Sequence, residues 1–409
     1  MAGQLSVARI ALAWELGGSI GHALSCAGLA RALHARGHAI ALAYRELRPL
    51  ALVTESDAYD VFQAPRNLRE AIGVGIPASY AEILLGCGYR DGAELASLLG
   101  AWRTLLAQWK PDFVVADFAP TALLAARSLG IRRATYGNGF FTPPRLSPLP
   151  PFRVDAPADT ERLRSADAQA LAGANAALAR FDAPPMATLA ELFAGDEEFL
   201  CTFPELDHYG SRPTSGYWGP RLRTDLGHEA RWPEGGGARV LVYLQRDSSH
   251  LDALIDTLVE SPHRVLAYIP ELEAARRERL SARHRIVLER PVRLDSILRE
   301  CDLLVCHGGE IAGGAVAAGV PVLLIPTHYE QYLTARCIDA LGCGGWLVPE
   351  AAPADVRVAI ATLTHGKFRA NARAYAARYP AYSPLEQRRR IVARIEDILS
   401  ASRDAGLPR

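Results

Sequence analysis

Short apolar runs alternate with longer stretches of helical periodicity along most of the chain. An uninterrupted apolar run is typical of a strand that is buried on both faces, and such strands belong to parallel sheets. Strands that alternate with helices form βαβ units, so the pattern predicts a doubly wound α/β fold in each half of the chain. The predicted strands lie at residues 9–14, 39–43, 111–117, 132–136, 240–244, 265–269, 286–288, 303–305 and 322–325.

A change of composition separates the two halves. Residues 223–237 contain the run Trp-Pro-Glu-Gly-Gly-Gly, which interrupts regular structure and predicts an interdomain linker. The N-terminal domain is therefore expected at 1–222 and the C-terminal domain at 238–409. A chain of 409 residues is long enough to give each domain a core of its own. Residues 384–400 are predicted to form a last, amphipathic helix.

Composition and charge narrow the classes of protein to which the chain can belong. Its 45 basic and 45 acidic residues give a formal net charge of zero, so charge gives no reason to expect a nucleic-acid partner. No stretch approaches the roughly 20 apolar residues of a membrane span, and we expect no stable membrane insertion. The N-terminus has no basic region and reaches Glu15 early, unlike a signal peptide, so we expect the chain in the cytoplasm.

The seven cysteines are scattered along the chain. They form no C-x-x-C pair and no set with histidine at zinc spacing. We therefore expect reduced thiols, as in other cytoplasmic proteins, and neither a metal site nor a cofactor.

Two predicted strands of the N-terminal half end at residues suited to acid–base chemistry. The first strand leads into a Gly-rich turn that ends at His22, and the strand at 111–117 ends at Asp117. Ligands of open α/β sheets bind at the carboxyl ends of strands, where both side chains are expected. A histidine can accept the proton of a hydroxyl while a carboxylate on its other nitrogen fixes the tautomer. The plainer alternatives are a polar turn residue for His22 and a helix N-cap for Asp117.

A second Gly-rich turn follows the strand at 303–305. The sequence from Cys306 to Gln331 is C-H-G-G-E-I-A-G-G-A-V-A-A-G-V-P-V-L-L-I-P-T-H-Y-E-Q, which predicts a turn, a helix of small residues and a buried strand. Backbone N–H groups at a helix N-terminus bind anions, and glycines let a diphosphate approach the backbone. The sequence therefore predicts a diphosphate site. The glycines before His22 do not follow G-x-G-x-x-G, which argues against an NAD-dependent dehydrogenase.

The stretch at 306–331 resembles the donor-binding signature of glycosyltransferases with the two-domain GT-B fold. The nearest group is the nucleotide-sugar-dependent family that includes UDP-glucuronosyltransferases and macrolide glycosyltransferases. Pro291 lies sixteen residues before His307, as the proline of the signature does. The run G-H-A-L-S-C-A-G-L-A-R-A-L-H-A-R-G-H at 21–38 is similar to the opening of these enzymes. Tyr-Trp-Gly-Pro at 217–220 is similar to the motif that closes their first half.

The resemblance implies two Rossmann-like doubly wound domains that face a cleft, with a last helix that crosses back to the N-terminal domain. It implies a hexosyltransferase-type enzyme that transfers a sugar, with inversion and without a metal, from a nucleotide-sugar donor to a hydroxyl of a small-molecule acceptor. By the resemblance, His22 of this chain would be the catalytic base and Asp117 would orient its imidazole ring. The donor would be bound by His307, Gly308, Gly309, Glu310, Glu330 and Gln331.

These donor residues have different expected partners. By the resemblance, His307 and the Gly308–Gly309 turn hold the diphosphate, and Glu330 and Gln331 form hydrogen bonds with the sugar hydroxyls. Glu310 suits the positive end of a helix dipole, but its charge would repel a diphosphate.

The chain departs from the family pattern at two places. Ile311 and Ala312 stand where the family has a pair with a phosphate-binding hydroxyl, and the loop there is one residue shorter. Glu289 stands where the family often has a tryptophan that stacks on the donor base. Two alternatives therefore stay open. One is a GT-B-like protein that binds a nucleotide sugar without turnover, and the other is a nucleotide-sugar epimerase of the same fold.

Only composition indicates the acceptor. Residues 137–153 form a loop rich in Gly, Pro and Phe, and such a loop beside a site often shapes a pocket. Apolar helical stretches lie within 66–110. Together they predict an apolar or aromatic small molecule rather than a charged polymer.

Overall fold

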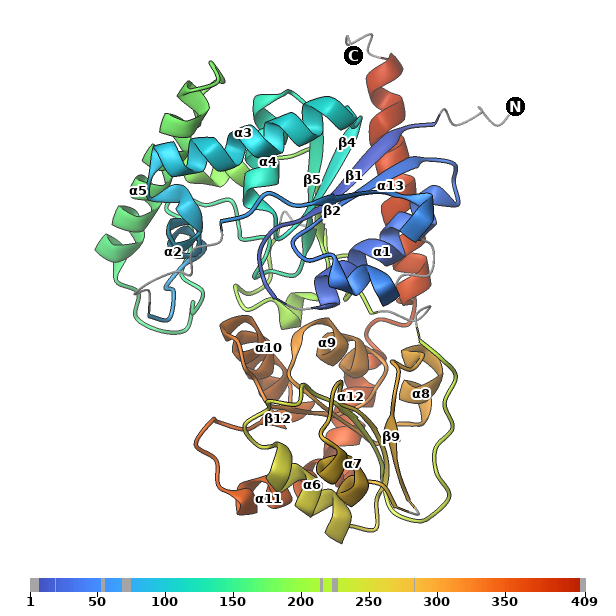
Figure 1. Cartoon of the computed structure of the whole chain (residues 1–409). Helices are drawn as coiled ribbons and strands as arrows, with labels where there is room; N and C mark the ends of the chain where they lie inside the picture. The colour runs from blue at the N-terminus through green and yellow to red at the C-terminus, as the bar shows by residue number, and fades with distance from the viewer. Residues whose placement is uncertain are drawn as a thin grey trace. The chain divides into compact units, whose positions relative to one another are not determined.

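The computed structural model describes residues 7–18, 20–52, 56–67, 75–213, 216–222, 227–282 and 284–404. The chain divides into two compact units (Figure 1). Unit 1 comprises Met1–Pro204, His208–Gly219 and Leu385–Arg409. Unit 2 comprises Glu205–Asp207 and Pro220–Pro384. Of the predicted linker, residues 223–226 lie outside the described residues.

Unit 1 is built around a six-stranded parallel sheet with the order β3-β2-β1-β4-β5-β6. This is the strand order of a Rossmann fold, in which the connections change direction between β1 and β4. The strands are β1 (Arg9–Trp14), β2 (Ala39–Tyr44), β3 (Asp60–Gln63), β4 (Phe113–Asp117), β5 (Arg132–Gly137) and β6 (Glu197–Leu200). The helices are α1 (Ile20–His34), α2 (Tyr80–Leu84), the π-helical η3 (Leu85–Tyr89), α3 (Gly92–Trp109), α4 (Pro120–Ser128), α5 (Thr160–Ala179) and α13 (Pro384–Asp404). Short 3-10 helices lie at Arg48–Leu52, Ser56–Ala58 and Leu189–Phe193.

Unit 2 repeats the same topology with the order β12-β11-β10-β7-β8-β9, again all parallel. Here the connections change direction between β7 and β10. The strands are β7 (Arg239–Tyr243), β8 (Arg264–Tyr268), β9 (Arg285–Leu288), β10 (Leu303–Cys306), β11 (Val322–Leu324) and β12 (Gly344–Trp346). The helices are α6 (Leu251–Glu260), α7 (Ala274–Leu280), α8 (Leu294–Glu300), α9 (Gly309–Ala317), α10 (Tyr329–Ala340), α11 (Pro353–Leu363) and α12 (Gly366–Ala376). A 3-10 helix, η5 (Pro204–Leu206), lies at the first change of unit.

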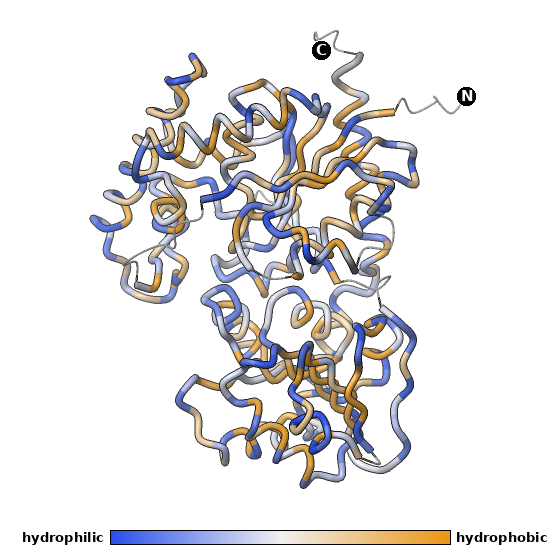
Figure 2. The backbone as a smooth tube through the Cα atoms, in the orientation of Figure 1, coloured by the Kyte–Doolittle hydropathy of each residue, from blue (hydrophilic) through white to orange (hydrophobic). Residues whose placement is uncertain are grey.

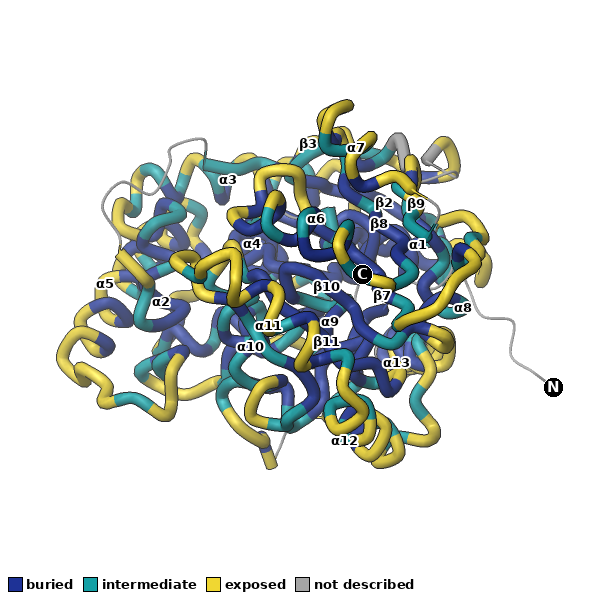
Figure 3. The backbone as a smooth tube through the Cα atoms, turned by 90° about the horizontal axis from the view of Figure 1, so that it is seen from below, coloured by how far each residue is buried: buried dark blue, intermediate teal, exposed yellow. Residues whose placement is uncertain are grey.

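The central strands of each sheet are buried on both faces. Every residue of β4 and of β10 is buried, as are all residues of β1 except the first. Hydrophobic positions follow the strands in both units (Figure 2), and β7, β8 and β10 lie among the buried parts of unit 2 (Figure 3). Removing apolar surface from water, at about 25 cal/mol per Å², is the main force that holds such a core together.

The nine predicted strands are all present, but β3, β6 and β12 were not predicted. All three are sheet edges, and they are only three or four residues long. Polar residues and glycines interrupt their apolar pattern, as in D-V-F-Q and G-G-W. Exposed edge strands are often short and polar, which limits pairing with other chains.

The C-terminal helix α13 packs within unit 1. Its Glu396 accepts hydrogen bonds from Nε and a terminal nitrogen of Arg36 at 2.9 and 3.1 Å. Nε2 of His38 lies 3.3 Å from the same carboxylate. Arg394 contacts Glu197 of β6 at 2.5 Å. These bonds tie the helix to the α1–β2 connection and to an edge of the sheet.

Candidate active site

The histidine and the aspartate predicted as an acid–base pair are in contact in unit 1. Trp14 at the end of β1 is in register with Asp117 at the end of β4, the point at which the connections change direction. His22 lies in the first turn of α1, and its Nδ1 is 2.9 Å from Oδ1 of Asp117. Both side chains are buried, His22 at 7% and Asp117 at 0% exposure. Since a carboxylate only accepts, Nδ1 carries the proton and Nε2 is left as the acceptor.

Aromatic rings fix the orientation of this imidazole. The ring of His22 stacks on Trp14 at 5.7 Å and contacts Phe141 edge-on at 4.8 Å. Phe118 adds a third contact at 6.1 Å. A Cβ on Gly17, whose φ is +77°, would lie 3.0 Å from Nε2 of His22. Glycine at this position therefore keeps the acceptor nitrogen clear.

A buried carboxylate that the sequence analysis did not select supports the turn after β4. Glu15 follows β1 directly, and its Oε2 accepts a hydrogen bond from the backbone N–H of Thr121 at 2.8 Å. Next to it, the N–H of Leu16 donates to the carbonyl of Phe118 at 2.9 Å. Phe118 has a positive φ of 48°, so this turn is strained and needs such support. Burial raises the pKa of Glu15 to about 7.

The loop predicted to shape an acceptor pocket brings aromatic rings toward the pair. Phe140 stacks on Phe152 at 4.7 Å and contacts Phe118 at 6.1 Å. Phe141 contacts both Phe118 and the ring of His22. The surroundings of His22 are therefore largely apolar and aromatic.

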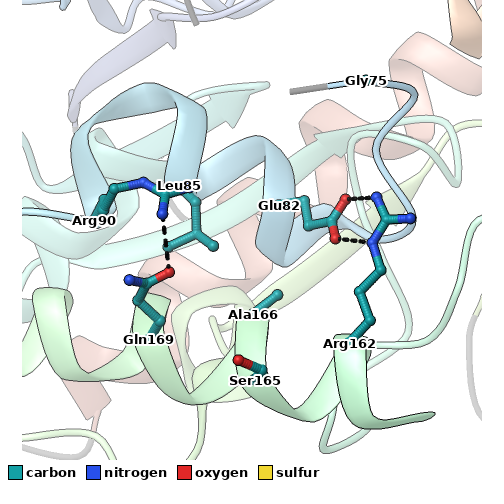
Figure 4. A pocket seen from close by; sticks show the side chains of 8 residues that line it. All are labelled: Gly75, Glu82, Leu85, Arg90, Arg162, Ser165, Ala166 and Gln169. Carbon is teal, nitrogen blue, oxygen red and sulfur yellow. Dashed lines mark hydrogen bonds and ion pairs between the residues drawn. The ribbon is translucent and has the colours of Figure 1, made fainter. Parts of the chain in front are cut away.

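A separate pocket of about 300 Å³ in unit 1 contains none of the predicted site residues. It lies between the α2–η3 segment and α5 (Figure 4). Arg162 lines it and pairs with Glu82 through two contacts of 2.5 and 2.7 Å. This bidentate pair joins α5 to α2, which is a structural role.

In unit 2, the Gly-rich turn after β10 has the geometry that only glycine adopts readily. Gly308 has a φ of 132° and Gly309 a φ of 67°, and α9 starts at Gly309. A Cβ on Gly308 would lie 2.9 Å from Cβ of Gln331. Glycine at position 308 therefore permits this backbone conformation and also lets the first turn of α10 approach closely.

His307 is engaged at both ring nitrogens. Its Nδ1 is 2.8 Å from the carbonyl of Ile325, and the backbone N–H of Gln245 donates to its Nε2 at 2.8 Å. Nδ1 therefore carries the proton and donates. Burial is the main cause that lowers the pKa of His307 below its usual value. The neutral ring joins the segments that follow β7, β10 and β11.

The other predicted donor residues gather around the same turn. Oε1 of Gln331 accepts hydrogen bonds from the N–H and the hydroxyl of Thr327 at 2.8 and 3.0 Å, so it caps the N-terminus of α10. Glu330 accepts a hydrogen bond from the hydroxyl of Thr334 at 3.3 Å. Its Oε2 would lie 3.9 Å from a Cβ on Gly309.

Glu310, in the first turn of α9, is paired with an arginine that the sequence analysis did not select. Nε and a terminal nitrogen of Arg221 both contact Oε1 of Glu310. The side chain of Arg221 is 2% exposed and that of Glu310 is 18% exposed. The signal was present, because Arg221 directly follows the Tyr-Trp-Gly-Pro motif.

Among the described residues, no three His, Cys, Asp or Glu side chains are arranged to hold a metal ion. No helix in the same part of the chain is long and apolar enough to span a membrane.

Comparisons with known proteins point to one class. No protein-family model matches the chain. It is 46% identical to the NDP-glycosyltransferase YjiC of Bacillus subtilis (strain 168) over 55 residues, and these residues make up 13% of this chain and 14% of that protein. It is 43% identical over 65 residues to demethyllactenocin mycarosyltransferase of Streptomyces fradiae, 16% of this chain and 14% of that protein. The chain thus spans about one seventh of the length of these curated relatives.

Solved structures match over nearly the whole chain. The spinosyn forosaminyltransferase SpnP matches with a TM-score of 0.65 at 20% identity, and the match covers 97% of this chain and 100% of the SpnP chain. The glycosyltransferase of kitacinnamycin has a TM-score of 0.67 at 19% identity, with 96% and 100% covered. The Streptomyces sp. SF2575 glycosyltransferase SsfS6, complexed with thymidine diphosphate, has a TM-score of 0.62 at 20% identity, with 95% and 99% covered.

The fold and these likenesses agree with each other. The chain has the GT-B fold with two Rossmann-like units, as the sequence predicted. It is similar to nucleotide-sugar-dependent glycosyltransferases, among them enzymes of macrolide and antibiotic glycosylation.

Proposed function

We propose that this chain is an enzyme that transfers a sugar from a nucleoside diphosphate sugar to a hydroxyl of a small-molecule acceptor. The observation that carries the proposal is the buried contact of 2.9 Å between His22 and Asp117. It occurs at the carboxyl ends of adjacent strands, where ligands bind to open α/β sheets. A protein that only binds a nucleotide sugar has no need of this pair.

The pair supplies a base for the attacking hydroxyl. Nε2 of His22 accepts the hydroxyl proton while the acceptor oxygen bonds to the anomeric carbon. The bond from that carbon to the diphosphate breaks on the opposite face, so the configuration inverts. Asp117 stabilises the imidazolium that forms and holds its tautomer. The nucleoside diphosphate leaves with the electron pair of the broken bond.

The turn after β10 is the proposed donor site. Backbone N–H groups at Gly308, Gly309 and the N-terminus of α9 would hold the leaving diphosphate without a metal. Glu330 and Gln331 would bind sugar hydroxyls. His307 would act mainly by bracing the turn, because both of its ring nitrogens already have partners.

An apolar or aromatic acceptor fits the surroundings of the base. Phe118, Phe140 and Phe141 lie around or near His22, and apolar rings bind apolar acceptors. The spinosyn rhamnosyltransferase SpnG, whose structure is similar at a TM-score of 0.61 and 16% identity, has been solved complexed with spinosyn aglycone. The cytoplasmic location remains a prediction from the sequence.

Two candidates of other classes remain. A non-catalytic nucleotide-sugar-binding protein is favoured by Ile311 and Ala312, which offer no hydroxyl to a phosphate. A nucleotide-sugar epimerase of the same fold would change its donor without any acceptor.

The test is a thermal-shift screen against nucleoside diphosphates and nucleotide sugars, with and without EDTA, followed by NMR of the product. A ligand at a hundredfold excess over its Kd adds about 2.7 kcal/mol to the stability of the folded state. We expect a shift with one nucleotide sugar that survives EDTA, and a product with inverted anomeric configuration. Binding without any acceptor-dependent product would favour the non-catalytic protein, and isomerisation of the donor alone would favour the epimerase.

A further inference from the structure

Arg221 contacts the first turn of α9, the helix that begins where the donor diphosphate is proposed to bind. Its side chain is buried, and two of its nitrogens contact one carboxylate oxygen of Glu310. Glu310 is the second residue of α9 and is partly exposed. A buried cation therefore meets a partly exposed anion at the N-terminus of α9.

Two glycines of α9 explain how the segment that carries Arg221 reaches this place. A Cβ on Gly313 would lie 3.2 Å from Cγ of Pro220. A Cβ on Gly314 would lie 2.6 Å from Cδ1 of Leu222, closer than real Cβ contacts. Residues 220–222 therefore rest directly on the helix surface, which places the arginine between them at its first turn.

Charge explains why a cation is needed there. Glu310 and Glu330 both lie at the turn, and a diphosphate brings further negative charge. Like charges in a partly buried site repel strongly because the local dielectric is low. The helix dipole contributes only about half an elementary charge. The hydroxyl that the family uses at this turn is replaced here by Ile311 and Ala312.

We propose that Arg221 supplies the positive charge that lets this turn bind the donor diphosphate, and that Glu310 holds its guanidinium ready between donor molecules. The inference rests on the proposed function, because it takes the donor to be a nucleoside diphosphate sugar. A guanidinium presents its N–H donors in a planar fork that matches phosphate oxygens. The arriving diphosphate competes with Glu310 for this fork, so the carboxylate weakens the binding that the arginine provides.

The test measures the Kd of thymidine diphosphate and of UDP by calorimetry, at low and at high salt. The full chain is used as wild type, Arg221→Met, Arg221→Lys, Glu310→Gln and the double variant Arg221→Met/Glu310→Gln. We expect Arg221→Met to weaken binding at least tenfold and Glu310→Gln to tighten it severalfold. The double variant should return to within about threefold of the wild type, because it removes both charges. Arg221→Lys keeps the charge and should weaken binding less than Arg221→Met.

A matched control is the exposed pair of Arg276 with Asp252 in the same unit, whose contact is 2.6 Å. Arg276→Met should leave both affinities unchanged. Should Arg221→Met not fold, tighter binding by Glu310→Gln and weaker binding by Arg221→Lys, each compared with the wild type, decide the matter. Equal affinities of wild type, Arg221→Lys and Glu310→Gln would overturn the inference and leave the proposed function standing. Failure of the wild type to bind any nucleoside diphosphate would overturn both.

Discussion

Replacing Glu15 by glutamine should stabilise unit 1 in alkaline solution and have little effect in acid. The carboxyl group is buried at 1% exposure, and its pKa is raised from 4.5 to about 7. In the unfolded chain it ionises near 4.5. Between these values the folded state binds the extra proton, so stability falls as the pH rises through this window and stays lower above it. The neutral amide of Glu15→Gln avoids this loss and can still accept the hydrogen bond from Thr121.

The magnitude follows from the two pKa values. The rise of the pKa from 4.5 to about 7 lowers the free energy of unfolding by roughly 3 kcal/mol in total once the carboxyl is ionised in both states. About 2.5 kcal/mol of this loss develops between pH 5 and pH 8. The free-energy gap between Glu15→Gln and wild type should therefore grow by about 2 to 3 kcal/mol over that range.

Urea unfolding at pH 5 and pH 8, with pulsed hydrogen exchange read by mass spectrometry, measures unit 1 and unit 2 separately. Other titrating groups are common to both proteins and cancel in the difference. Glu161→Gln, which changes an exposed carboxylate in the first turn of α5, should show an equal gap at both pH values. An equal gap for Glu15→Gln at both pH values would instead mean that the carboxyl of Glu15 ionises normally in the fold.

Two more predictions concern single positions of unit 1. Gly17→Ala should lower kcat at least tenfold, because the added Cβ would press on Nε2 of His22. It should also destabilise unit 1 by about 1 kcal/mol, because the position has a positive φ. Steady-state kinetics measure the first effect and thermal melting the second. Glu396→Gln should destabilise unit 1 by about 2 kcal/mol at pH 7. Although burial acts to raise the pKa of Glu396, hydrogen bonds from Arg36 and His38 lower it overall. The stability it provides is therefore fully present above the unfolded value of 4.5 and is lost as the pH falls through the lower pKa of the folded state. Urea unfolding should accordingly show a smaller difference between the variant and the wild type at pH 3 than at pH 7.

The sequence predicted the central strands of both sheets because burial on both faces leaves a continuous apolar run. It did not predict β3, β6 and β12, because an edge strand pairs on one side only and tolerates polar residues and glycine. The contact between His22 and Asp117 followed from two strand ends that the topology places side by side.

Pairings between distant segments could not be predicted in the same way. His307 meets the backbone of Gln245, 62 positions away, and Arg221 meets Glu310, 89 positions away. Glu15 was visible as a charge after an apolar strand, but its partner Thr121 lies 106 positions on. Neither hydrophobic period nor turn chemistry contains information about such partners, which depend on how the sheets assemble.

Nε2 of His22 is proposed to accept the hydroxyl proton during sugar transfer, and acceptor-dependent release of nucleoside diphosphate reports on this step. His22→Ala should lower kcat at least 100-fold, as loss of a general base does, and leave the Kd of the donor unchanged. His34→Ala, at an exposed histidine at the other end of α1, should keep wild-type rates. Turnover by His22→Ala within about threefold of the wild type would mean that His22 is not the base.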